Sequence, residues 1–113
     1  MADRIGGGWT QPGSSLPNTA FAVTRPPPAS GKQHVLSGMS ISFNGTPSTP
    51  VEVMVIDPDV SPNTLLWDGY VGQSRDVEFP GGIHVPPGHQ VAVAVAAGGG
   101  SLICIATLYG QTV

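Results

Sequence analysis

The chain has 113 residues, of which 16 are glycine and 12 are proline, and only 10% are charged. This length supports one domain with one hydrophobic core and excludes separate catalytic and substrate domains. Because 40% of the residues are apolar, we expect an ordered, turn-rich β-domain whose weakly charged surface suits packing against neighbours.

The net charge of −3 is distributed unevenly along the chain. Residues 1–32 carry a charge of +2, whereas residues 33–113 carry −5, with Arg75 as their only fixed cation. Without a basic face, the protein is not expected to bind nucleic acid directly. Its longest apolar run, residues 91–97, is too short to cross a membrane. No secretion signal precedes Trp9, so we expect a chain that is made and folded in a cytoplasm.

Residues 1–32 are expected to form an extended N-terminal arm. A glycine run and three consecutive prolines, at residues 26–28, predict neither a helix nor a strand inside a sheet. Apolar side chains in such a segment need a pocket, either on their own domain or on a neighbour. For Trp9, we favour an anchor between subunits. The residues predicted to make these contacts are Trp9, Leu16, Phe21, Val23 and Arg25.

Residues 33–113 are predicted to form strands throughout. No window of twelve residues is free of glycine and proline while carrying apolar residues at helical spacing. Residues 35–43 and 91–95 alternate with period two, and residues 102–109 are apolar on both faces, as in a central strand covered on each side. For residues 65–71, we expect one continuous strand, with Gly69 at a bulge or a close contact, rather than a hairpin.

Turn residues separate these strands at about every 10–15 residues, and residues 80–82 are one of the predicted turns. This spacing predicts an all-β, antiparallel sandwich of about eight short strands. The side chains expected in its core lie in the middle of apolar alternations. They are Phe43, Val53, Val55, Phe79, Val93, Val95, Ile103 and Ile105.

Several glycine and valine motifs point to a family. They lie at residues 34–43, 66–71, 79–83, 87–88, 91–100 and 108–110. In these motifs the chain resembles small jelly-roll-like proteins encoded among phage virion genes. The resemblance spans about residues 34–110 and leaves the arm uncovered. It implies a jelly-roll-like fold and a role as a capsid decoration (cement) protein or a tail- or fibre-associated module, commonly trimeric.

Few residues offer metal chemistry. His84 and His89 flank a proline-rich turn, but no third ligand follows at local spacing. Asp57 and Asp59, with Asn63, match no calcium-binding loop, and a turn held by the Asp57 side chain is the preferred interpretation. An ion at either pair is left open as the alternative. We expect no metal and no cofactor.

The lone cysteine, Cys104, alternates with Leu102 and Ala106, which predicts a small buried side chain rather than a nucleophile. It cannot form an internal disulfide. The serines lie in no Gly-x-Ser-x-Gly motif, and neither glycine run is followed by the lysine or helix of a phosphate-binding loop. We therefore expect no catalytic residues and no enzyme.

The residues and the resemblance together lead us to expect a structural virion protein on the surface of a phage particle, synthesised in the host cytoplasm. As a capsid decoration protein, it would bind the major capsid protein, assemble as a trimer and stabilise the head by bridging capsid subunits through its arm. Because the arm and the oligomeric domain are linked, several contacts that are weak one by one would together give strong binding to the capsid.

The alternative is a receptor- or glycan-binding module of a phage tail or fibre. In that case Trp67, Asp68 and Tyr70 are the candidate sugar contacts. Because Trp67 falls on the same strand face as Leu65 and Val71, core packing is the preferred interpretation for this ring.

Overall fold

The computed structural model describes residues 8–59 and 64–113, which form eight strands and no helix. In chain order, the strands are β1 (Gly8–Ser14), β2 (Phe21–Arg25), β3 (His34–Phe43), β4 (Val51–Asp57), β5 (Thr64–Val71), β6 (Arg75–His84), β7 (Val91–Val95) and β8 (Cys104–Thr112).

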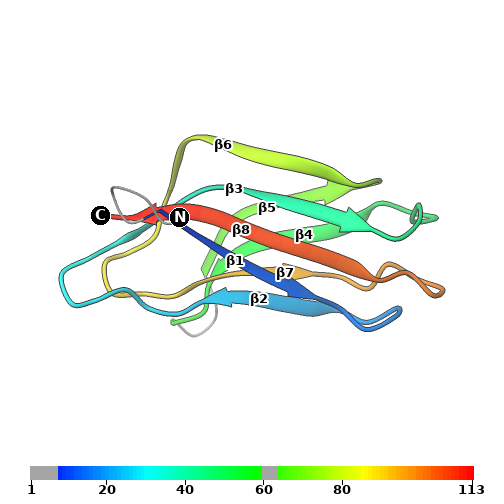
Figure 1. The fold of residues 1–113 in the computed structure, drawn as a ribbon, viewed down its shortest axis with the longest axis horizontal. Coiled ribbons are helices and arrows are strands. Elements are labelled where there is room, and N and C mark those ends of the chain that lie inside the picture. Colours follow the sequence, from blue (N-terminus) through cyan, green and yellow to red (C-terminus); the bar gives the residue numbers. More distant parts are fainter. Residues whose placement is uncertain (1–7, 60–63) are drawn as a thin grey trace.

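The strands build two four-stranded sheets, in which every pairing is antiparallel. One sheet has the order β1-β8-β3-β6 and the other has the order β2-β7-β4-β5 (Figure 1). Apart from β4 and β5, consecutive strands belong to opposite sheets, which is the two-Greek-key arrangement of a jelly roll. The structure therefore confirms the predicted antiparallel, jelly-roll-like β-sandwich.

The sheets bury one layer of side chains between them, rich in valine. Of the predicted core, six side chains are buried. They are Phe43, Val53, Val55, Phe79, Val93 and Val95. The prediction for Ile105 is wrong, because its side chain is 50% exposed, and Ile103 is only half-buried. Strand β8 lies between β1 and β3 as a central strand, but the second sheet covers only one of its faces.

Two local predictions have different outcomes. Residues 65–71 lie in one continuous strand, as expected, and a Cβ at Gly69 would come within 2.5 Å of the Trp67 ring, so the close contact is confirmed. The turn predicted at residues 80–82 is wrong, because these residues lie inside β6. Gly81 and Gly82 adopt positive φ there, opposite the register shift in β3. Residues 80–82 therefore form an irregular stretch of strand rather than a turn.

The N-terminal segment is extended, but its described part does not form an arm that is separate from the sandwich. Strand β1 pairs with β8, and β2 pairs with β7, so each sheet takes one edge strand from residues 8–25. Proline is tolerated at a sheet edge, which is where Pro12 lies. Residues 26–28 follow β2 outside any strand. Residues 1–7 of the predicted arm lie outside the described residues.

The edges formed by β1 and β2 approach each other closely and close one side of the sandwich. A Cβ at Gly13 would lie 2.6 Å from Cγ2 of Val23, so only glycine permits this approach. On the same two strands, the guanidinium of Arg25 donates to Oε1 of Gln11 at 3.1 Å. It also lies 4.8 Å from the centre of the Trp9 ring, a cation–π contact.

These contacts correct the expected role of Trp9 as an anchor between subunits. Its side chain is 6% exposed and belongs to the core of its own chain, as does Val23. Phe21 and Arg25 are half-buried, and only Leu16, 71% exposed in the β1–β2 loop, is free to reach a neighbour. An arm deletion that includes residues 8–25 would therefore remove two strands of the fold.

Substituting Trp9→Ala should lower the free energy of unfolding by about 3–5 kcal/mol, the usual cost of truncating a buried aromatic side chain. Leu16→Ala is the matched control and should change it by less than about 0.5 kcal/mol, because that side chain is exposed. Urea unfolding of both variants measures the difference. Equal stabilities would show that Trp9 is not part of this core.

Candidate functional site

Strand β1 begins and β8 ends at the same end of the sandwich (Figure 1). Most of the side-chain hydrogen bonds of the described residues lie at this end. The loop after β2 and the loop after β6 are joined there, because the amide of Gly88 donates to the carbonyl of Lys32 at 3.0 Å. The amide of Val85 likewise donates to the carbonyl of His34. The chain thus ties its own loops together at this end.

The last residue of β4, Asp57, is 2% exposed and accepts two hydrogen bonds. Nδ1 of His89 donates to its Oδ2 at 2.7 Å, and the amide of Asp59 donates to its Oδ1 at 3.1 Å. Gln90 donates from its amide and its side chain to the two oxygens of Asp59. These bonds to Gln90 hold the pKa of Asp59 below its ordinary value.

Asp57, Asp59 and His89 offer oxygen and nitrogen atoms within 4.8 Å of one another, a set that a divalent cation could use. All three residues already take part in hydrogen bonds, and the bonds from His89 and Gln90 clasp the β6–β7 loop to Asp57 and Asp59. These hydrogen bonds by themselves explain why the three residues lie together, and we call this arrangement the polar clasp. Asn63, the third residue of the calcium alternative, lies outside the described residues.

The structure separates the two histidines that the sequence offered as a pair. His84 is exposed at the end of β6, whereas His89 is bonded to Asp57. The sequence analysis missed this partnership because the two residues lie 32 positions apart. The feature that could have revealed this contact is an aspartate at the end of a buried strand, because a buried carboxylate needs hydrogen-bond donors.

A second cluster surrounds His34, which is 2% exposed. Its Nε2 donates to the carbonyl of Pro26 at 2.7 Å, and Nδ1 lies 2.9 Å from Oγ1 of Thr112. The Trp9 ring packs edge-on against the imidazole, with 5.4 Å between the ring centres. Both ring nitrogens are therefore hydrogen-bonded. They connect His34 on β3 to the β2–β3 loop and to β8, and the contact with Trp9 connects it to β1.

The three residues predicted to contact a sugar do not share a face. Trp67 is half-buried between the sheets, where its ring meets Phe79 edge-on at 5.3 Å, which confirms the preferred core interpretation. Asp68 and Tyr70 are both exposed, and they alternate with Trp67 along β5. A stacking platform made of all three side chains is therefore not assembled.

The outer faces of the two sheets differ in chemistry. The outer face of β2-β7-β4-β5, which we call the alanine face, is built from two registered rows. These are Ala22, Ala94, Met54 and Asp68, then Thr24, Ala92, Ile56 and Leu65. Its side chains are mostly small or aliphatic.

The outer face of β1-β8-β3-β6, which we call the hydroxyl face, is polar. Its registered rows are Pro12, Thr107, Ser40 and Asp76, then Thr10, Tyr109, Gly38 and Glu78. Partial burial, together with the nearby carboxylates of Asp76 and Glu78, raises the pKa of Tyr109 above its ordinary value. The two outer faces thus differ in chemistry. The alanine face is mostly apolar but includes Glu52 opposite Tyr70, and the hydroxyl face is mostly polar but includes the exposed Ile105.

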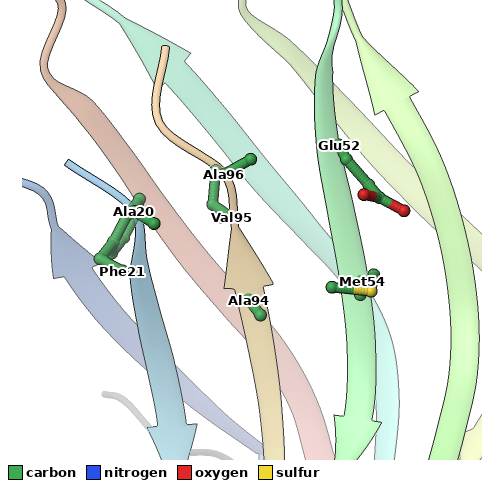
Figure 2. A pocket seen from close by; sticks show the side chains of 7 residues that line it. All are labelled: Ala20, Phe21, Glu52, Met54, Ala94, Val95 and Ala96. Atoms are coloured by element: carbon green, nitrogen blue, oxygen red, sulfur yellow. The ribbon is translucent and has the colours of Figure 1, made fainter. Parts of the chain in front are cut away.

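A depression of about 350 Å³ lies on the alanine face, as shown in Figure 2. It is lined by residues from β2, β7 and β4 and from the segments beside them, namely Ala20, Phe21, Glu52, Met54, Ala94, Val95 and Ala96. Glu52 is the only charged residue of this lining. Hydrogen bonding with Asp68, together with repulsion between the two carboxylates, raises the pKa of Glu52 above its ordinary value.

Comparison with known proteins adds no family: no protein-family model matches the chain, and no curated protein matches it. Within residues 8–59 and 64–113, no helix is long and apolar enough to cross a membrane. Function must therefore be argued from these surfaces and clusters.

Replacing Asp57 with alanine should lower the free energy of unfolding by about 1–3 kcal/mol, because two donors near a buried position lose their acceptor. His84→Ala should change it by less than about 0.5 kcal/mol, since that side chain is exposed. Urea unfolding with and without EDTA makes the measurement. A fall in the stability of the unmodified protein on EDTA treatment would contradict the clasp and establish a bound cation.

Cys104 is 4% exposed, as the sequence predicts, and desolvation raises the pKa of its thiol from 9.0 to about 11. Below both values, this shift alone leaves the folded protein with about 100-fold less thiolate than the unfolded chain. We expect an aromatic disulfide reagent at pH 8 to react at least that much more slowly with the native protein than with the protein in urea. Similar rates would show that the thiol is accessible.

Proposed function

We propose that this protein is a structural component of a phage particle, a capsid decoration protein that lies on the shell with its alanine face against the major capsid protein. The observation that carries the proposal is the contrast between the two outer faces. The alanine face is mostly small and aliphatic, with carboxylates, among its described residues, only at Glu52 and Asp68, whereas the other face combines two carboxylates with rows of hydroxyl side chains. A protein that sits on a surface needs such a division, with one side against protein and the other in water.

The composition supports this role. With 10% of its residues charged, the chain gains little from ion pairs with a neighbour, so apolar burial has to supply most of the association. Tyr70 and Leu65 are 61% and 52% exposed on β5, at the rim of the alanine face. Repetition of the same contact over a trimer would multiply a weak affinity.

The bridging element differs from the one that the sequence predicted. Strands β1 and β2 are used inside the sandwich, so the described residues bridge neighbours through a sheet face rather than through a long arm. Leu16, at the opposite end of the sandwich from Gly8 and Val113, remains an exposed apolar contact residue. A glycan-binding role on a tail or fibre has less support, because Trp67 is turned inward.

Ala94→Glu should reduce the occupancy of the protein on particles at least tenfold, because it places a charge in the middle of the alanine face. Thr107→Glu is the matched control, also half-buried on an inner strand, but on the hydroxyl face, and should bind like the parent. Occupancy is measured by cryo-electron microscopy of particles mixed with each folded variant.

Equal occupancy of both variants would show that the alanine face is not the docking surface. Density at the tail rather than on the head would exclude the decoration role and favour the tail or fibre module. If only the Thr107→Glu variant lost occupancy, the hydroxyl face would be the one that lies against the shell.

A further inference from the structure

The depression on the alanine face joins an apolar floor to an acidic rim. Ala94, Ala96 and Met54 contribute aliphatic surface, and the Glu52 side chain stands at the side nearest β5 (Figure 2). Its volume of about 350 Å³ lies near the lower end of the roughly 300–1,000 Å³ of small-molecule sites. The space therefore suits one or two side chains rather than a large ligand.

Two carboxylates lie together at this rim. Glu52 on β4 lies opposite Tyr70, and Asp68 on β5 lies opposite Met54, so the two carboxylates are diagonal neighbours on the same outer face. Their interaction raises the pKa of Glu52. Diagonal neighbours on paired strands lie within reach of each other, and like charges there repel. The arrangement costs free energy in the isolated chain, and a cation placed between the two carboxylates would recover it.

The described part of the chain supplies no such cation. Among residues 8–59 and 64–113, the one ion pair joins His89 to Asp57, at the other end of β4. Arg25 is engaged by Gln11 and the Trp9 ring. Lys32 lies beside the β6–β7 loop, at the Asp57 end of β4. Arg75 begins β6 in the opposite sheet.

We propose that the depression is a docking site for a segment of a partner protein that presents a lysine or arginine side chain beside an aliphatic one. The aliphatic side chain lies on the alanine floor, and the cationic group meets Glu52 and Asp68. Charge complementarity selects this occupant, since an acidic or purely apolar segment would leave the two carboxylates unpaired. The long stem of lysine or arginine suits a site that is apolar below and charged at its rim.

This inference goes beyond the proposed function, because it needs no particle and concerns the recognition of one segment. It can therefore be tested on the isolated protein. A chain of 11.5 kDa is well suited to nitrogen-15 NMR, which detects weak binding residue by residue.

The probe is a capped Gly-Arg-Ile-Gly peptide, titrated into the full-length labelled protein. We expect saturable shifts at the amides of Glu52, Met54, Ala94 and Ala96, and no shifts on the hydroxyl face. A peptide with citrulline in place of arginine tests the charge, because citrulline keeps the length of the side chain and loses the cation. It should bind about two- to fivefold more weakly, the range of an exposed ion pair.

Glu52→Gln should weaken binding of the arginine peptide by the same factor and leave binding of the citrulline peptide unchanged. Asp76→Asn is the control for net charge, because it removes an exposed carboxylate from the other face. It should leave both affinities as they are. This double comparison separates a direct charge contact from a general electrostatic effect.

Shifts on another face, or equal effects of Glu52→Gln and Asp76→Asn, would overturn the proposal. Self-association that Arg4→Glu and Glu52→Gln abolish equally would show that the occupant is a second copy of this chain, and would overturn the assignment to a separate partner. A decoration protein that fails to bind particles would leave this peptide result unaffected.

Discussion

Two four-stranded sheets share a single layer of buried side chains, and this layer determines what the rest of the surface can be. Valines of β4 and β7 fill it from one side, and Leu36, Met39, Ile41 and Leu108 fill it from the other. Because side chains in a strand alternate between faces, burying one set sends every other residue outward. The chemistry of each outer face thus follows from which residues alternate with the core.

That constraint gives the molecule its two different surfaces. On β7 the residues between the core valines are alanines, so this part of the outer face is apolar and carries short side chains. On β3 and β8 the outward-facing residues include serine and threonine. Among the outward-facing residues of β4, β5 and β7, the charged ones are Glu52 and Asp68. A mostly apolar surface with a depression and two carboxylates at one side of it offers both area for contact and a means of fixing the position of a partner. This combination links the proposed docking face to the proposed basic segment.

The polar clusters have a different role, because they stabilise the end of the sandwich where β1 begins and β8 ends. His34 joins the β2–β3 loop to β8, and the bond between His89 and Asp57 joins the β6–β7 loop to β4. Buried polar groups of this kind are tolerable only when they are hydrogen-bonded, and these are. The residues that looked most like chemistry in the sequence are therefore occupied in stabilising loops.

Alternation and turn residues in the sequence were sufficient to predict an all-β sandwich, six of the eight core side chains named from it, the buried Cys104 and the continuous strand around Gly69. These features depend on neighbours within a few positions, which is the range over which period two and turn chemistry act. The sequence also predicted that Trp67 faces the core, on the side of Leu65 and Val71. Val71 does share that side, but a register shift between Val55 and Ile56 turns Leu65 to the alanine face.

Only the tertiary structure decided where the N-terminal strands lie and what the polar residues contact. Glycine and proline in residues 1–32 suggested an arm, but an edge strand tolerates both, and long-range pairing with β7 and β8 places Trp9 in the core. Ile105 faces water because no second layer covers that side of β8. The contact between Asp57 and His89, and the pairing of Glu52 with Asp68, join residues from separate strands and loops. Local patterns carry no information about such contacts, because sheet order and register bring these residues together.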